Sequence, residues 1–285
     1  MAELATNIQI QQSSRIRALT FPREHGAWGL LLIPLVTGAC IALPYGRGFA
    51  DLTLFVVAAL SIFWLRTPTE SYFGMGLLRI GNEEENRAVL RTIGLLAPIA
   101  VASLAGLLWG GRNLPLLLLG LIGGTAFALQ AVVRLFGRRV RMLAQAVGSL
   151  GLTSTAAGAY YAVTGRFDER ALAVWFACWL FAGDQIHYVQ IRLRNSRVEG
   201  FARRLVAARN FLGGQVLMLV IIGAAAKIDV LPAFAIVAFL PVVLRGFLWL
   251  TDKKTELDLH WLGISELVQG VVFGVLLTAL FLSRM

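Results

Sequence analysis

The sequence predicts an all-α fold: a polytopic membrane bundle of nine transmembrane helices around a cavity that opens to the cytoplasm. Three observations predict this fold: the composition, the number of long apolar segments, and the depth of a few charged residues within them. Hydrophobic residues make up 58% of the 285 residues and charged residues 15%, against about 25% charged residues in ordinary globular proteins. With a mean hydropathy of +0.73, this composition excludes a disordered protein, a secreted disulfide scaffold and a soluble nucleic-acid-binding protein.

Nine apolar segments are each long enough for a helix that crosses a membrane, which takes roughly 20 residues. They cover residues 25–43, 52–70, 92–111, 114–133, 142–163, 171–190, 210–227, 230–250 and 262–282. Residues 1–20 are polar and are expected to form a cytoplasmic N-terminal tail without a cleavable signal peptide. Residues 21–285 are expected to form a single transmembrane domain.

The basic residues predict the orientation of these segments. Of the 26 Lys and Arg residues, 20 lie on one side: 18 in the N-terminal tail and in the connections that would share its side of the membrane, and Arg66 and Arg245 in the adjoining parts of two apolar segments. Because basic connections stay in the cytoplasm, the N-terminus is expected inside and the C-terminus outside. Topology and anionic lipid thus account for the net charge of +10, and no nucleic-acid partner is needed.

Pairs of glycines four residues apart predict places where two helices approach closely, because a missing side chain lets backbones come together. The pairs are Gly106 with Gly110, Gly120 with Gly124, and Gly270 with Gly274.

Four charged residues lie inside the apolar segments, where a charge is costly and usually lines a cavity. Counted at 1.5 Å per residue from the outer end, Arg66, Asp184, Arg245 and Glu266 come out about 20–26 Å deep. The arginines could extend to the head groups instead, as long side chains often do. The acidic side chains are too short for this, so the shared depth favours a polar cavity open to the cytoplasm.

Two polar arrays repeat with a spacing of four residues, which places each array on one helix face: Arg66, Glu70 and Gly74, and then Asp184, Tyr188 and Arg192. One interpretation is a pair of charge contacts that neutralise each other. The other is an anion site, because guanidinium groups bind phosphate or carboxylate oxygens bidentately. A carboxylate in each array, Glu70 and Asp184, could also bind a magnesium ion.

The three histidines, His25, His187 and His260, fall at expected cytoplasmic helix ends, where they could act as ligands or bases. Histidine is also common at membrane interfaces without such a role. The acidic run at 83–85 is expected to be a solvated face.

The motif Phe-Pro-Arg-Glu-His-Gly-Ala-Trp-Gly at residues 21–29 continues into Leu-Leu-Leu-Ile-Pro at 30–34. It closely resembles the signature of the YwiC-like family of bacterial membrane proteins. The resemblance implies a place in the bacterial cytoplasmic (inner) membrane, and it implies little about chemistry.

More distantly, nine helices with polar connections after the second and sixth are similar to the UbiA superfamily of intramembrane prenyltransferases. Those enzymes bind magnesium and an isoprenoid diphosphate through an Asn-x-x-x-Asp-x-x-x-Asp motif and a second Asp-rich motif. By position the two motifs correspond to the two arrays of this chain, in which Glu70 and Asp184 alone keep an acid. The resemblance therefore implies these two as catalytic and metal-binding residues, with Mg²⁺ in doubt because most acids are replaced.

The resemblance and the residues leave three functions open. The first is a UbiA-like, prenyltransferase-type enzyme, in which Tyr188 would face an allylic cation and arginines would stabilise the leaving diphosphate. The second is a non-catalytic carrier or flippase for an amphipathic anion, and the third is a lipid-binding subunit. The expected partners are the lipid bilayer and a lipophilic small molecule. The expected substrate-binding residues are Arg66, Arg192, Arg245, Glu266, His25 and His187.

Overall fold

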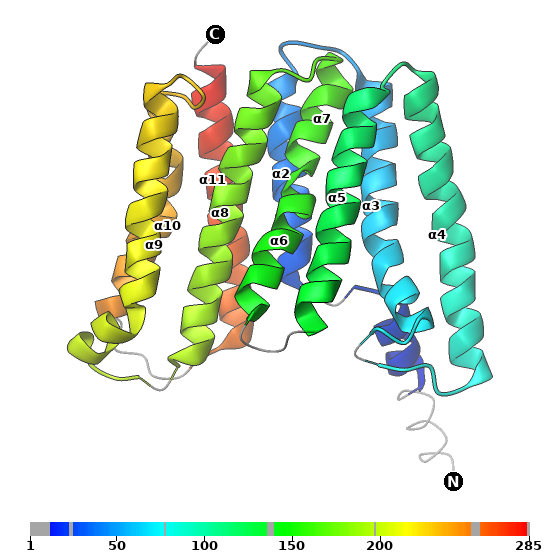
Figure 1. Ribbon diagram of the computed structural model, residues 1–285, viewed down its shortest axis with the longest axis horizontal. Coiled ribbons are helices and arrows are strands. Elements are labelled where there is room, and N and C mark those ends of the chain that lie inside the picture. The colour runs from blue at the N-terminus through cyan, green and yellow to red at the C-terminus, as the bar shows by residue number, and fades with distance from the viewer. Residues whose placement is uncertain are drawn as a thin grey trace. The chain divides into compact units, whose positions relative to one another are not determined.

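The computed structural model describes residues 12–22, 25–76, 78–135, 140–196, 198–251 and 257–283, and their regular structure is helical throughout. A helical stretch covers residues 12–20. It is followed by ten helices (Figure 1): α2 His25–Ala42, α3 Phe49–Tyr72, α4 Glu83–Trp109, α5 Leu114–Leu135, α6 Arg141–Thr153, α7 Thr155–Thr164, α8 Glu169–Arg194, α9 Phe201–Lys227, α10 Ile236–Thr251 and α11 Leu259–Leu282.

The all-helical prediction is confirmed, and each predicted apolar segment overlaps one helix except the fifth, which is divided at Ser154. The helices α4 and α9 begin nine residues before their segments, and α10 begins six residues after the start of its segment. Three consecutive hydroxyl side chains bond to carbonyls of the preceding turn at this point. Thr153 donates to the Ser149 carbonyl at 2.8 Å, Ser154 to Gly151 at 2.7 Å and Thr155 to Leu152 at 2.8 Å. Such bonds compete with the helical hydrogen bonds and bend a helix, so α6 and α7 are separate helices.

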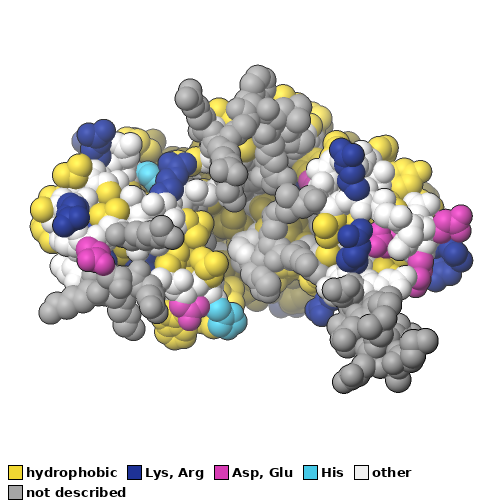
Figure 2. All heavy atoms as spheres, turned by 90° about the horizontal axis from the view of Figure 1, so that it is seen from below, with side chains coloured by type: hydrophobic (Ala, Val, Ile, Leu, Met, Phe, Trp, Pro, Cys, Tyr) yellow, Lys and Arg dark blue, Asp and Glu magenta, His cyan; other side chains and the backbone are white. Residues whose placement is uncertain are grey.

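Four of the described helices are long and apolar enough to cross a membrane by length and composition alone: α3, α4, α9 and α11. Shorter apolar helices occur at Gly26–Ala42, Leu114–Gln130 and Ile236–Thr251. Figure 2, which looks along the helices, shows Lys and Arg side chains at the helix ends among hydrophobic ones. The chain is therefore a membrane protein with an all-α fold.

The chain forms two compact units. The first unit consists of Met1–His25 and Phe49–Asn113, and in it α3 and α4 lie side by side in opposite directions (Figure 1). One end of this pair is tied by Arg112, whose guanidinium lies 3.0 Å from the Asp51 carboxylate. Near the other end, the Trp64 indole donates to the Thr20 carbonyl at 2.7 Å and attaches the helical stretch 12–20 to α3.

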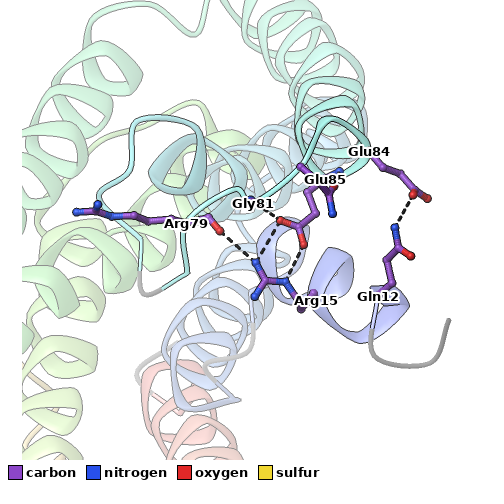
Figure 3. Close-up of polar contacts among 7 residues, drawn as sticks. Gln12, Arg15, Arg79, Gly81, Glu84 and Glu85 are labelled. Carbon is purple, nitrogen blue, oxygen red and sulfur yellow. Dashed lines mark hydrogen bonds and ion pairs between the residues drawn. The ribbon is translucent and has the colours of Figure 1, made fainter. Parts of the chain in front are cut away.

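Glu85 is the polar anchor at the start of α4, and the expectation that residues 83–85 form a solvated face is wrong for this residue. Its side chain is 2% exposed and accepts from the Arg15 guanidinium at 2.7 Å and 3.2 Å and from the Gly81 N–H at 2.7 Å (Figure 3). Asn82 caps the helix by accepting from the Glu85 N–H at 2.8 Å. Glu85 thus turns back over the helix end, much as in a capping box, instead of facing water.

The second unit consists of Gly26–Gly48 and Leu114–Met285, and contains α2 and α5 to α11. In α11, a side chain at Gly270 or Gly274 would collide with Ile33 or Thr37 of α2. This glycine pair therefore sets a close helix crossing, as its spacing predicts. At Gly120 and Gly124, by contrast, an added side chain would meet no described atom within 4 Å, so this pair makes no such crossing within the described residues.

We expect the cap and the anchor of α4 to stabilise the first unit. Asn82→Ala removes the acceptor for the Glu85 N–H and should lower the free energy of unfolding by about 1 kcal/mol. Arg15→Ala should also lower the unfolding temperature, because it removes the guanidinium from a buried carboxylate. The matched control is Arg87→Ala, whose pair with Glu83 is exposed and worth at most about 0.5 kcal/mol. Equal unfolding temperatures for all three variants in detergent would contradict this account.

Candidate functional site

A network of buried charges joins three helices of the second unit. Arg245 of α10 donates through Nη1 to Glu266 of α11 at 2.5 Å and through Nη2 to Asp184 of α8 at 3.3 Å. The side chains of Arg245 and Asp184 are 9% and 4% exposed, and that of Glu266 is 13% exposed. These three residues are called the charged network below.

The lengths of the helices place the charged network inside the bundle. At 1.5 Å per residue, Arg245 lies about 9 Å from the end of α10, and Glu266 about 10 Å from the start of α11. Asp184 lies about 15 Å before the end of α8. Since α8 and α11 run in opposite directions (Figure 1), these positions meet at one level. The sequence predicts that Asp184, Arg245 and Glu266 lie at the same depth, and in the structure the three side chains are in direct contact.

Three neutral side chains complete the charged network. The Gln215 amide of α9 donates to Asp184, and the Gln185 amide donates to the Glu266 carbonyl at 2.7 Å. Tyr188, one turn after Asp184, lies under Arg245, with the guanidinium carbon 3.9 Å from the ring centroid. A guanidinium over an aromatic face is stabilised by the electrons of the ring.

Gln185 and Gln215 are not predicted from the sequence, because formal charge was the only signal used within the apolar segments. Gln215 is an amide in the middle of an apolar helix and is 3% exposed. A buried amide must find a hydrogen-bond partner for the same reason that a buried charge must. The useful signal is therefore any strongly polar side chain within an apolar segment.

Two atoms of the charged network and the side-chain oxygens of two glutamines lack a hydrogen-bond partner in the described part of the chain. Among the described residues, four buried side-chain atoms have no hydrogen-bond partner: Gln215 Oε1, Arg245 Nε, Glu266 Oε2 and Gln269 Oε1. Three of the four are acceptor oxygens. Most buried polar atoms in proteins are paired, so these atoms mark a place where a bound group can add contacts.

The formal charges of the network do not balance by themselves. Asp184 and Glu266 contribute two negative charges, and Arg245 contributes one positive charge that it does not lose in proteins. Arg192, two turns after Asp184 on α8, interacts electrostatically with Glu266 and is half-buried. Charges at this depth interact strongly because the surrounding apolar side chains screen them little.

A small apolar pocket adjoins the charged network. It is lined by Gly29, Leu30, Ile33, Pro34, Cys178, Phe181, Gln185 and Phe273, and its volume is about 10 Å³, room for about one water molecule. Gln185 belongs to both places, because it lines the pocket and donates to the backbone carbonyl of Glu266. The pocket is far smaller than the roughly 300–1,000 Å³ of typical ligand sites. A larger apolar guest beside the charged network would therefore need the helices around this pocket to move apart.

Two further predicted site residues are described within the first unit. Arg66 and Glu70 belong to the first unit, where they form an ion pair at 3.0 Å with side chains 15% and 21% exposed. Gly74 ends their array in a left-handed conformation, with φ of 67°. The spacing of Arg66 and Glu70 allowed two interpretations, a charge contact or an anion site, and the structure shows the charge contact.

The histidines have no described contact with the charged network. His187 lies within α8, not at its end, because the helix continues past the predicted boundary to Arg194. Its ring contacts Phe211 edge-on at 5.3 Å. α2 begins at His25, whose side chain lies outside the described residues. His260 is exposed in the first turn of α11.

The two expected magnesium ligands belong to different units, Glu70 to the first and Asp184 to the second. In the part of the chain that the structure describes, no three His, Cys, Asp or Glu residues are grouped so that they could hold a metal ion. Within the second unit, Asp184 and Glu266 are the acids that converge, and both already accept from Arg245.

Removal of the shared guanidinium should destabilise the second unit. Arg245→Met leaves Asp184 and Glu266 buried without their cation, so we expect a loss of about 3–5 kcal/mol in the free energy of unfolding. Adding Asp184→Asn and Glu266→Gln to this variant should restore most of the loss, because no uncompensated charge remains.

The control for this prediction is Arg112→Met, which breaks the more exposed pair with Asp51 and should cost at most about 1 kcal/mol. Denaturant unfolding in detergent measures each variant. A triple variant as unstable as Arg245→Met alone would show that charge balance is not what the guanidinium supplies.

Comparison with known proteins bears on the N-terminal half of the chain. The YwiC-like protein family matches residues 21–161, from the motif at residues 21–34 through α7. No curated protein and no solved structure matches the chain. The family match confirms the resemblance that the motif indicates, and residues 21–161 of this membrane protein are YwiC-like.

Proposed function

We propose that the chain binds an amphipathic, lipid-like ligand, with its polar head at the charged network and its apolar part between the apolar helices beside Gln185. One observation carries this proposal: a guanidinium and two carboxylates meet inside an apolar helix bundle. Ionisable residues at membrane depth are expensive, and they usually mark a site where a substrate or an ion binds. Gln185 connects the two parts of the site.

The membrane arrangement that fits this proposal has nine transmembrane segments in one domain, with the helices arranged as in the UbiA superfamily. The N-terminus would lie inside and the C-terminus outside the bacterial cytoplasmic membrane. The charged network would then lie nearer the cytoplasmic side, because α8 would run from the outer side inwards. The distribution of Lys and Arg residues supports this orientation.

In the enzymatic form of the proposal, the chain is a prenyltransferase-type enzyme that acts on an isoprenoid with a diphosphate head. Arg245 and Arg192 would stabilise the negative charge that develops on the leaving diphosphate. Asp184 would contribute to magnesium binding, and Tyr188 would face the allylic cation. One face of the Tyr188 ring is covered by Arg245, so this role requires the guanidinium to move toward the diphosphate.

In the alternative form, the chain is a carrier or flippase for an amphipathic anion and breaks no bond. The occupied guanidinium favours it, because Arg245 already donates to two carboxylates. An arriving anion would replace these carboxylates as the partner of Arg245. Such an exchange of partners requires no reactive group, and it reverses when the anion leaves.

The nine-span arrangement requires α8 to cross the membrane, although its polar residues keep it outside the four clearly apolar candidates. Glu169→Cys lies at the start of α8 and Glu199→Cys lies after its end, in the connection to α9, and both positions are exposed. In a chain whose Cys40 and Cys178 are replaced by Ala, a membrane-impermeant maleimide should label them from opposite sides of sealed vesicles. Glu83→Cys should label from the same side as Glu199→Cys. Labelling of both ends of α8 from one side would contradict the arrangement.

The ligand can be tested with farnesyl diphosphate as the probe and the unfolding temperature of the purified chain as the readout. If magnesium bridges the diphosphate and the acids, the probe should stabilise the chain more when Mg²⁺ is present. Asp184→Asn should then abolish this dependence. If the arginines bind the anion alone, the same substitution should strengthen stabilisation by the probe, because it removes a competing carboxylate.

The control for the ligand experiment is Asp51→Asn, which also removes an acid from an ion pair with arginine but lies outside the proposed site. It should leave the effect of the probe unchanged. Incubation of labelled probe with a membrane-lipid extract separates the two forms of the proposal. A new prenylated product supports the enzyme, and stabilisation without a product supports the carrier. If the probe stabilises the chain under none of these conditions, the proposal that the ligand has an anionic head group is wrong.

A further inference from the structure

The two parts of α2 are packed unequally within the second unit. Every turn of the helix over residues 31–42 contains buried residues, whereas residues 26–30 are all exposed or half-buried. A side chain added at Gly38 would collide with the backbone of Ala156 in α7. The later part of α2 therefore lies directly against α7, and close packing of this kind resists movement.

The early part of α2 has looser contacts. A side chain added at Gly26 would meet no described atom within 4 Å. One added at Gly29 would make only ordinary contacts, at 3.9 Å, with the side chains of Ile33 and of Leu267 in α11. Residues 26–30 can therefore shift without breaking a close contact of the backbone at either glycine.

Pro34 lies inside α2 where these two parts meet. A proline has no N–H to donate to the carbonyl four residues earlier, here that of Leu30, and helices bend at such sites. At the next residue, the Thr155 hydroxyl donates to the Leu31 carbonyl at 3.0 Å. The helix is thus weakened at Leu30 and fixed to α7 at Leu31.

Both parts of α2 line the apolar pocket. Gly29 and Leu30 come from the loosely packed part, and Ile33 and Pro34 come from the fixed part. The rest of the wall belongs to α8 and α11, which are joined through Arg245 of the charged network. Movement of residues 26–30 can therefore enlarge the pocket without separating α8 from α11.

We propose that residues 26–30 of α2 form a gate to the apolar pocket and swing outwards about a hinge between Leu30 and Pro34. When the gate is closed, the pocket has room for about one water molecule. When it opens, the space beside Gln185 can admit an apolar chain, and Cys178 on the pocket wall becomes accessible. The inference rests on the proposed function for what enters, namely the apolar part of an amphipathic ligand.

The native thiol of Cys178 reports the opening of the gate, because it lines the pocket and is 1% exposed. The test uses the purified full-length chain in detergent with Cys40→Ala and without any lipid probe. The rate at which Cys178 reacts with methyl methanethiosulfonate is followed by mass spectrometry. Pro34→Ala supplies the missing N–H and should slow this reaction about fivefold, as expected for one added helix hydrogen bond.

Gly29→Ala is a second variant that tests the gate if Pro34→Ala fails to fold. Its methyl group would contact Ile33 and Leu267, and alanine favours the helix more than glycine does. It should therefore also slow the reaction of Cys178.

The matched control is Pro98→Ala, which makes the same backbone change inside α4 of the first unit and should leave the rate at Cys178 unchanged. A second reporter distinguishes opening of the gate from unfolding. Ala208→Cys, at a position of α9 that is 0% exposed, is introduced into a chain without the two native cysteines. Its reaction should not respond to Pro34→Ala.

Three outcomes would overturn the gate. In the first, Cys178 of the otherwise native chain reacts only on unfolding. In the second, neither Pro34→Ala nor Gly29→Ala slows its reaction. In the third, Pro34→Ala slows the reaction at Ala208→Cys as much as that at Cys178, which would indicate a change in global stability.

Failure of this inference is distinguishable from failure of the proposed function. A chain that farnesyl diphosphate stabilises, but in which neither variant slows the reaction of Cys178, retains the ligand site and loses the gate. A chain in which Pro34→Ala slows the reaction of Cys178, but which the probe does not stabilise, retains the gate and loses the amphipathic ligand.

Discussion

The rest of the site depends on one constraint: a charge inside an apolar helix bundle must be compensated by neighbouring groups. Arg245 does not lose its proton in proteins. The carboxylates of Asp184 on α8 and Glu266 on α11 therefore form ion pairs with it. Those two acids are then themselves buried, and Gln215 contacts one of them. Each buried polar side chain needs a partner, and that partner is in turn buried and needs another. The positions of four helices are coupled in this way through one guanidinium.

Close packing determines what lies beside these charges. Gly270 and Gly274 bring α2 against α11, and the Phe181 and Phe273 rings stack at 4.1 Å where α8 meets α11. The apolar pocket forms between these contacts and reaches Gln185. The two glycines therefore help to place the apolar pocket next to the charged network. This juxtaposition is what makes an amphipathic ligand a chemically consistent guest.

The same network limits how an anionic ligand can bind. The guanidinium that would attract a diphosphate is already engaged by two carboxylates, so binding requires an exchange of partners and not a simple addition. Selectivity would then arise from charge balance within the bundle, where an unbalanced charge is expensive, and not from the number of arginines alone.

The sequence by itself determined the helical class, the boundaries of most helices, the four charges at membrane depth and the YwiC-like motif, because apolar length and formal charge are local properties of the chain. It did not determine the break at Ser154, the burial of Glu85 or the role of Gln215, which depend on backbone hydrogen bonds and on partners distant in sequence. Tertiary structure alone decided that Asp184, Arg245 and Glu266 share contacts while Arg66 pairs with Glu70. Depth along a helix can be counted from the sequence, but the direction in which a side chain faces is set by the packing of neighbouring helices.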